Sequence, residues 1–357
     1  MSADHSRTLK EDYPWAASPL ISSAPMRLIA TSPLALAVSR AQGLGFLGLG
    51  TDTSSFSELY EQCSSSLESS PISDVPQGVL PIGVGFICWG ANLSSALSVI
   101  QSATLKPAAA WLFAPQDPKD LLEWTDGIRL ASNSKTKIWI QVGTVQMALD
   151  VARSCKPDIL VIQGADAGGH GLAQSSSIVS LLPECADALE REGLGDIPLL
   201  AAGGIVDGRG AAAALTLGAS GISMGTRFLA CPEAVITDGY RNAVINAKDG
   251  GVTTARTTVY DRLRGTHGWP ETYNGRGILN QSFRDHQNGM NEDENKKLYE
   301  EATKLGDKGW GDGGRMCTYA GTSVGLIHKI VPAKEIVREV LSDCRAHLQR
   351  AQMKVQV

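Results

Sequence analysis

The chain has 357 residues and a formal net charge of −5 at pH 7. This length can bury a large core and fits one barrel with additions or two ordinary domains, of which we expect one barrel. The acidic balance leaves no basic surface for a nucleic acid or an anionic membrane, so we expect neither as a partner.

The cysteines and the N-terminal residues indicate in which cellular compartment the protein works. The seven cysteines are odd in number, show no CxxC spacing and do not cluster with histidines, so we expect core residues and no metal site. The first eighteen residues carry charges but no apolar stretch, and no later apolar run is long enough to span a bilayer. These features predict a cytoplasmic protein.

From Leu20 onward, short apolar runs alternate with longer amphipathic runs, which is typical of βα units around a parallel sheet. The expected strands are residues 20–23, 45–48, 79–86, 108–113, 137–142, 159–163, 198–202 and 221–224. The helices expected between them are residues 33–42, 54–67, 93–102, 118–133, 144–154, 175–192 and 207–217. Eight such repeats predict an α/β fold, the (β/α)8 TIM barrel.

The last third of the chain does not continue this repeat. Its expected helices are residues 232–247, 291–308, 319–329 and 333–349. Residues 250–282 are expected to form a long irregular excursion, either a lid over a site or a homodimer contact. We therefore divide the chain into a flexible segment (1–18), the barrel (19–249), the excursion or lid over the mouth (250–314) and C-terminal helices that complete the barrel domain (315–357).

The stretch that organises the chain is ILVIQGADAGGHG, residues 159–171. Its apolar run from Ile159 to Ile162 suits a strand covered on both faces, as in a parallel sheet. Gln163 ends this run, and the glycines that follow let the backbone approach a ligand closely. His170 comes directly after the turn, and histidine is the side chain best suited to proton transfer near neutral pH.

The seventh and eighth expected strands end in Gly203-Gly204 and Gly225-Thr226. Small residues leave the backbone N–H groups at these strand ends uncovered. In a (β/α)8 barrel the loops after these two strands commonly bind a phosphate through such groups. The sequence therefore predicts a phosphate site built by these four residues.

Six collinear segments carry a resemblance to a known family. They are Ala24-Pro25-Met26, SPLALAVSRAQGLGFLG (32–48), VIQGADAGGHG (161–171), PLLAAGGIVDGRG (198–210), GISMGTRFLACPEA (221–234) and AGTSVGLI (320–327). With them, the chain resembles nitronate monooxygenase, formerly called 2-nitropropane dioxygenase, of the FMN-dependent barrel type, over residues 20–337. The stretch YDRLRGTHGWPETYNGR (260–276) resembles fungal members in particular.

The resemblance implies non-covalent FMN at the C-terminal mouth of the barrel, with a small-molecule substrate and O2. The implied reaction is the oxidation of nitronates, nitroalkanes or a similarly acidic carbon acid. His170 corresponds to the catalytic base that removes the proton beside the nitro group. The residues that correspond to the cofactor site are Ala24 and Met26 against the isoalloxazine, Gln163 as a hydrogen-bond partner of the flavin, and Gly168, Gly203, Gly204, Ser223, Met224, Gly225 and Thr226.

Other residues refine this hypothesis. His267 and Trp269, in the excursion, are candidate substrate contacts. The chain departs from the family pattern at Gly85, where many members carry an asparagine that reaches FMN, and at Ser223, where a glutamine or similar polar residue often stands.

Two alternative functions stay open. One keeps the flavin, as an NAD(P)H-dependent reductase of quinones or enoyl thioesters, or as a secondary-metabolism oxidase or isomerase with His170 as base. The other is a barrel without flavin that binds a phosphorylated metabolite or a structural partner.

Overall fold

The computed structural model describes residues 5–311 and 313–355, and eight parallel strands within them form a barrel in the order β1-β9-β8-β6-β5-β4-β3-β2. The strands are β1 (Leu20–Ser23), β2 (Phe46–Gly50), β3 (Val79–Ile87), β4 (Lys106–Phe113), β5 (Lys137–Val142), β6 (Ile159–Gln163), β8 (Leu199–Ala202) and β9 (Gly221–Met224). The barrel closes where the N–H of Leu44 donates to the carbonyl oxygen of Ile21 at 2.9 Å. The predicted (β/α)8 barrel is confirmed.

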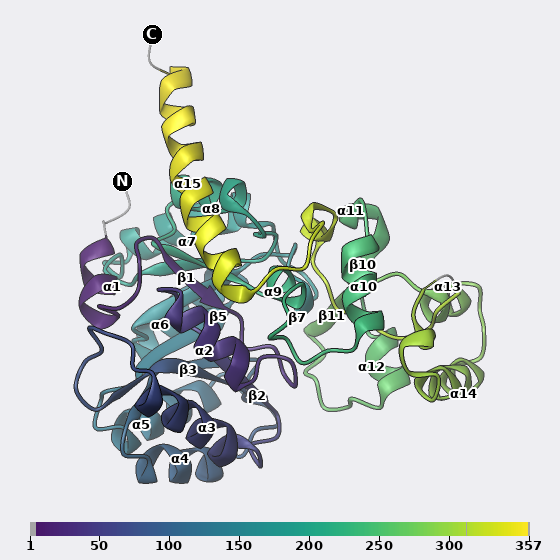
Figure 1. The fold of residues 1–357 in the computed structure, drawn as a ribbon, viewed down its shortest axis with the longest axis horizontal. Helices are drawn as coiled ribbons and strands as arrows, with labels where there is room; N and C mark the ends of the chain where they lie inside the picture. The colour runs from purple at the N-terminus through teal and green to yellow at the C-terminus, as the bar shows by residue number, and fades with distance from the viewer. Residues whose placement is uncertain (1–4, 312, 356–357) are drawn as a thin grey trace.

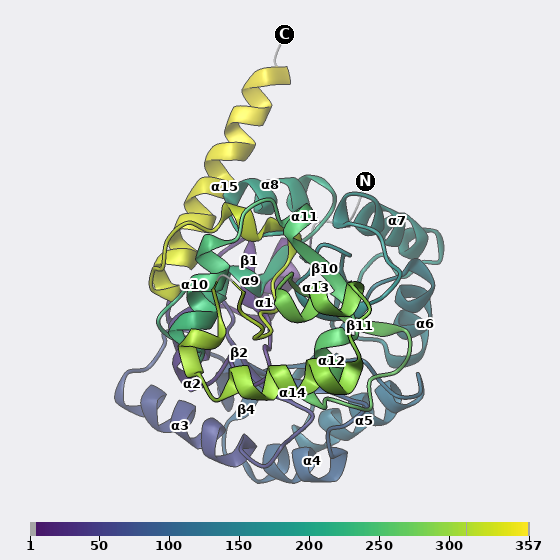
Figure 2. The ribbon, with the colours of Figure 1, turned by 90° about the vertical axis from the view of Figure 1, so that its right-hand side faces the viewer.

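Helices connect successive strands and ring the outside of the barrel, as Figure 2 shows. They are α2 (Ser32–Arg40), α3 (Phe56–Ser69), α4 (Leu93–Ser102), α5 (Asp120–Ala131), α6 (Val145–Cys155), α7 (Ile178–Arg191) and α8 (Gly208–Thr216). Side-chain caps fix some of their starts: Asn92 accepts from the N–H of Ser95, and Asp207 from the N–H of Gly210. All the helices expected between the strands lie where they were predicted, with ends that differ by a few residues.

Large aromatic side chains fill the barrel interior. Phe46, Trp111 and Trp139 come from three different strands, and the ring centroid of Phe46 lies 5.0 Å from that of Trp139 and 5.4 Å from that of Trp111. All three side chains are buried. The barrel is therefore a packed core, and a ligand has room only at its mouth.

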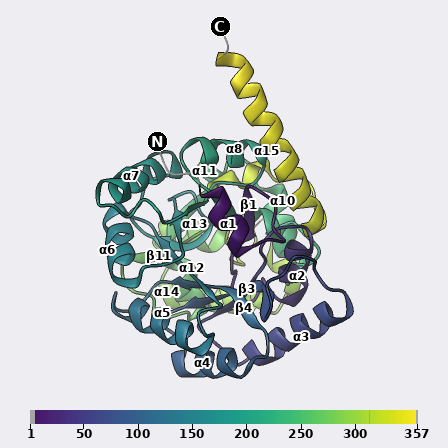
Figure 3. The same cartoon turned by 90° about the vertical axis from the view of Figure 1, so that its left-hand side faces the viewer.

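The N-terminal segment closes the end of the barrel opposite the mouth. Helix α1 (Ser6–Asp12) lies across this end, as Figure 3 shows, and Tyr13 and Trp15 follow it into the core. The indole N–H of Trp139 donates to the Tyr13 hydroxyl at 2.7 Å. In the segment expected to be flexible (1–18), these two aromatic side chains are buried against the barrel floor.

Residues after β9, together with β7, build a second layer over the mouth (Figures 1 and 2). Its elements, with the closing helix, are β7 (Gly169–Leu172), α9 (Thr226–Leu229), α10 (Asp238–Asn246), α11 (Gly250–Thr253), β10 (Thr254–Thr257), α12 (Val259–Arg264), β11 (Tyr273–Ile278), α13 (Gln281–Gln287), α14 (Glu292–Thr303), η1 (Gly306–Gly309), η2 (Thr322–Leu326) and α15 (Ala333–Val355). We call β10, α12, β11, α13 and α14 the lid. Helix α15 packs on α8 and α2 and projects beyond the barrel.

The expectation of an irregular excursion at 250–282 is wrong. This stretch forms α11, β10, α12 and β11, and β11 pairs antiparallel with both β10 and β7. The pairing with β7 joins Gly275 to His170, far apart in the chain, so no local pattern could reveal it. The lid has its own small core, formed by Val259, Tyr260, Leu263, Phe283 and Tyr299, and Cys317 from the segment between η1 and η2 packs with it.

Two expected helices are also corrected. The helix expected at 232–247 begins only at Asp238, because Thr237 caps it by accepting from the N–H of Tyr240. The helix expected at 319–329 is reduced to the short 3₁₀ helix η2, because its residues hydrogen-bond to the loops of the mouth instead of to one another.

Two further findings concern the membrane and the cysteines. Along the described residues, no helix combines the length and the apolar character needed to cross a bilayer. All seven cysteines are buried and free, as expected for core residues.

The barrel floor can be tested by truncating Trp15, which is 4% exposed. We expect Trp15→Ala to lower the free energy of unfolding by about 3–5 kcal/mol, because it leaves a cavity beneath the aromatic core. Urea unfolding followed by fluorescence measures this change. The control is Leu130→Ala at a side chain that is 82% exposed, and an equal effect of the two substitutions would contradict the packing.

Candidate active site

The ends of β8 and β9 meet at the mouth and are joined by one C-terminal segment. The two strands are parallel neighbours, with Ala202 opposite Ser223. The N–H of Gly321 donates to Thr226 Oγ1 at 3.0 Å, and the Ser323 hydroxyl donates to the carbonyl oxygen of Gly204. The structure thus brings the two predicted glycine turns together.

Glycine is required at the end of β8 by both backbone conformation and space. Gly203 has φ +98° and Gly204 has φ +75°, in the left-handed region that favours glycine. A Cβ on Gly203 would lie 2.9 Å from the carbonyl oxygen of Gly164 and 3.0 Å from the N–H nitrogen of Ala167. The turn therefore keeps its backbone bare and close to the β6–β7 loop.

Several donors at the ends of β8 and β9 have no partner among the residues that the structure describes. Within the described residues, no hydrogen bond uses the N–H of Gly203, Gly204 or Gly225. The oxygen of Thr226 accepts from Gly321, which leaves its hydroxyl hydrogen free to donate. N–H and O–H donors grouped at strand ends in this way are typical of anion sites, and we call Gly203, Gly204, Gly225 and Thr226 the cradle.

Ser223 and Met224 lie on opposite faces of β9. Met224 is 1% exposed and packs in the core between barrel and helices, so its side chain lies away from the mouth. Alternation along the strand turns Ser223 toward the barrel interior, where its buried Oγ has no hydrogen-bond partner in the described part of the chain. Such an orphaned polar atom calls for a ligand or water.

The remaining predicted cofactor residues surround the same cradle. A Cβ on Gly225 would lie 3.5 Å from Ala24 Cβ and 3.7 Å from Met26 Sδ. Gly168 packs directly on the 320–321 backbone, where an added Cβ would come within 2.4 Å. Ala24, Met26 and Gly168 are thus brought to the cradle.

The departure at Gly85 has a steric reason. A Cβ at this position, near the end of β3, would lie 2.2 Å from Pro25 Cβ. Pro25 therefore occupies the space that an asparagine side chain would need.

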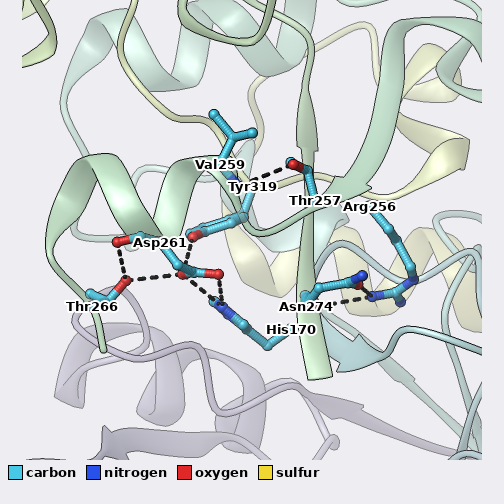
Figure 4. A network of polar contacts seen from close by, with 8 residues as sticks. All are labelled: His170, Arg256, Thr257, Val259, Asp261, Thr266, Asn274 and Tyr319. Carbon is cyan, nitrogen blue, oxygen red and sulfur yellow. Dashed lines mark hydrogen bonds and ion pairs between the residues drawn. The ribbon is translucent and has the colours of Figure 1, made fainter. Parts of the chain in front are cut away.

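His170 lies on β7 beside the cradle, in the polar network of Figure 4. Its Nε2 is 2.9 Å from Asp261 Oδ1 and 3.0 Å from Oδ2. The imidazole stacks on Trp269 with centroids 3.8 Å apart and an angle of 2° between the planes. The amide of Gln163 donates to the His170 carbonyl oxygen at 3.3 Å, so three predicted site residues come together.

Asp261 is a buried carboxylate that the sequence reasoning missed. Thr266 Oγ1 donates to Oδ1 at 2.9 Å and Tyr319 Oη donates to it at 3.0 Å. Burial raises the pKa of Asp261, but the hydrogen bonds from His170, Thr266 and Tyr319 outweigh it and hold that pKa below its ordinary value. Burial holds the pKa of Tyr319 well above its ordinary value, so the phenol stays a donor.

No sequence signal linked Asp261 or Tyr319 to His170, because they are separated from it by 91 and by more than 140 residues of chain. The other excursion candidate, His267, is exposed and makes no contact in this network. Trp269 reaches the site and His267 does not.

Two arginines flank the β6–β7 loop without a carboxylate partner. Arg256 Nη2 donates to the carbonyl oxygen of Ala167 and Arg276 Nε to that of Ala165, each at 3.3 Å. Neither forms an ion pair with a carboxylate among the described residues. Burial lowers the pKa of Arg256 to about 10, which leaves it charged at neutral pH. This corner therefore carries two guanidinium charges next to the Asp166 carboxylate.

Fold and site together define a (β/α)8-barrel enzyme with an anion cradle at two strand ends and a histidine–aspartate pair beside it. The sequence profile of nitronate monooxygenase matches residues 123–343. The chain is 47% identical to nitronate monooxygenase npaC of Metarhizium robertsii, over 96% of this chain and 95% of that protein. It is 37% identical to the nitronate monooxygenase of Neurospora crassa, over 95% of this chain and 93% of that protein. The chain belongs to the nitronate monooxygenase family of oxidoreductases, which implies a flavin cofactor.

Solved structures share the fold. FabK from Thermotoga maritima superposes with a TM-score of 0.72 at 24% identity, covering 98% of this chain and 99% of that chain. Nitroalkane oxidase from Streptomyces ansochromogenes superposes with a TM-score of 0.70 at 23% identity, covering 96% of this chain and 99% of that chain. These likenesses establish a common barrel architecture.

The cradle can be tested with Gly203→Ala. The left-handed backbone strain should cost about 1–2 kcal/mol of stability. The clash with the Gly164 carbonyl should also weaken flavin binding by about tenfold or more, since one misplaced charge-assisted hydrogen bond is sufficient for that. Thermal unfolding and flavin titration measure the two effects.

The matched control is Gly289→Ala. Gly289 also has a positive φ, +84°, but an added Cβ there meets nothing within 4 Å. It should show the strain alone. Equal flavin affinity in the two variants would argue against a cradle at Gly203.

Proposed function

We propose that the protein binds FMN non-covalently at the mouth and oxidises nitronates and nitroalkanes with O2. The observation that carries the proposal is a set of N–H groups at two adjacent strand ends that have no partner among the described residues and that pack on the loop leading to His170. We also propose a cytoplasmic location, which the free and buried cysteines support.

The residues present fit FMN. Gly203, Gly204, Gly225 and Thr226 would hold its phosphate through backbone N–H groups and a hydroxyl, which requires no cationic side chain. Ser223, with its orphaned buried Oγ, and Gln163, Ala24, Met26 and Gly168 would contact the rest of the cofactor. Bound FMN supplies the acceptor for substrate electrons and their transfer to O2.

The side chains of the mouth suit an anionic or acidic carbon compound. Arg256 and Arg276 raise the local concentration of an anion such as a nitronate. His170 takes the proton from the carbon beside the nitro group onto a ring nitrogen when the substrate arrives as a neutral nitroalkane.

An aromatic wall lies on the other side of His170. Trp269 contacts Trp89, Phe113 and Tyr273, with ring centroids 5.5, 6.1 and 6.3 Å away. These rings exclude water from the imidazole and leave an apolar surface for the carbon part of a small substrate.

Oxygen consumption tests the function. The purified protein should be yellow, release FMN on denaturation and consume O2 when given a nitronate without NAD(P)H. If no nitronate causes oxygen uptake, the proposed oxidation of nitronates is contradicted, whereas the proposed FMN site is not. Anaerobic bleaching of the flavin by NADH would instead indicate the reductase alternative.

The base is tested by His170→Asn. This variant should retain FMN, because His170 lies outside the phosphate cradle, but lose about 10²–10⁴-fold in turnover of a neutral nitroalkane. The visible spectrum and an oxygen electrode measure the two properties. Turnover at the wild-type rate would exclude the base role.

A further inference from the structure

The imidazole of His170 is held in one orientation by groups from distant parts of the chain. Both carboxylate oxygens of Asp261, on α12, lie within hydrogen-bond distance of Nε2. Trp269 stacks on one face of the ring, and the Tyr319 ring packs against it with centroids 5.2 Å apart. Within the described residues, no hydrogen bond uses His170 Nδ1. The imidazole therefore has one occupied nitrogen and one free nitrogen.

The Asp261 carboxylate is built to stay charged in this position. Helix α12 ends at Arg264, and Gly265 after it has a φ of +67°, which turns the chain so that the Thr266 hydroxyl reaches back to Oδ1. Tyr319 donates to the same oxygen. Among the described residues, Asp261 forms an ion pair with the His170 imidazole and with no other group.

Two other titratable groups lie close to this carboxylate. Arg264 lies over the Tyr319 ring with its Cζ 5.5 Å from the centroid. Burial raises the pKa of the Cys317 thiol to about 12, so it is neutral at physiological pH. Asp261 is the charged group in direct contact with the His170 ring.

We infer that Asp261 is the positioning residue for the base: it accepts the Nε2–H of His170, which fixes the tautomer with the lone pair on Nδ1. This inference rests on the proposed function. In the step itself, the C–H bond beside the nitro group breaks and its electron pair stays with the substrate, which becomes the nitronate. The proton forms a new bond to Nδ1, and the carboxylate at Nε2 stabilises the imidazolium that results.

Comparing the neutral and the deprotonated form of one substrate distinguishes a positioning role of Asp261 from a purely structural role. A neutral nitroalkane needs the base, whereas its nitronate has already lost the proton. The measured quantity is the ratio of kcat/KM for 2-nitropropane to kcat/KM for its nitronate, determined with FMN-loaded enzyme by oxygen consumption.

In Asp261→Asn the amide can donate to Nε2 and so hold the ring proton on Nδ1. We expect the nitroalkane-to-nitronate ratio to fall by about 10²-fold or more, the usual contribution of a positioned base. The matched control is Asp285→Asn, which removes another lid carboxylate, 12% exposed and paired with Arg315 outside the mouth. The control should leave the ratio unchanged.

The outcomes are distinguishable. The inference is overturned if Asp261→Asn leaves the nitroalkane-to-nitronate ratio unchanged. It is also overturned if Asp261→Asn and Asp285→Asn both lower kcat/KM for the nitroalkane and for the nitronate by the same factor. If the wild-type enzyme oxidises the nitronate but not the neutral nitroalkane, His170 does not act as a base and the inference about Asp261 is overturned. Wild-type enzyme that oxidises neither form contradicts the proposed function itself.

A second measurement needs no altered carboxylate. In ¹⁵N-histidine-labelled wild-type protein, the His170 signals are assigned by their absence in His170→Asn. We expect the proton on Nε2 and a bare Nδ1 in the neutral imidazole. A proton on Nδ1 overturns the inference even if Asp261→Asn does not fold.

Discussion

The unpaired backbone donors at the ends of β8 and β9 are the constraint on which the rest of the site depends. A polar group left without a partner away from water costs about 1–3 kcal/mol. In the described part of the chain the half-buried turn at Gly203 and Gly204 leaves its N–H groups without a protein partner, and the parallel register of β8 and β9 puts Gly225 beside them. Donors grouped in this way suit an anion, and we propose that the phosphate of FMN binds there.

The neighbouring elements are arranged to keep that place open. Residues of η2 and of the turn before it hydrogen-bond to Asp166, Gly204 and Thr226. They therefore connect the loops at the C-terminal ends of β6, β8 and β9. The barrel interior is packed with aromatic rings, which leaves chemistry only at the mouth. The lid then covers this mouth. Asp261 on α12 and Trp269, in the loop that joins α12 to β11, both contact the imidazole that lies there.

The sequence predicted the barrel because its signal is local. Each strand is an apolar run of four to nine residues buried on both faces, and each following helix has an amphipathic stripe. The glycine turns at 203–204 and 225 were found for the same reason, since a turn that needs a bare backbone shows it in the residues themselves. The placement of those turns side by side followed from the barrel alone.

The parts that were missed depend on contacts between distant residues. The pairing of β11 with β7, the return of Tyr13 under the barrel and the reach of Asp261 to His170 each join segments that have no shared pattern in the chain. Residues 319–329 have helical spacing of apolar side chains, yet bonds to three loops outweigh this local preference. Long-range polar contacts are the part of such a site that one sequence reveals least.

The most direct test of the account is a crystal structure of the protein loaded with FMN. We expect the phosphate to accept hydrogen bonds from the N–H groups of Gly204 and Gly225, with His170 Nδ1 facing the space over the flavin ring. A phosphate bound elsewhere on the barrel, or an imidazole whose Nδ1 faces away from the ring, would contradict it.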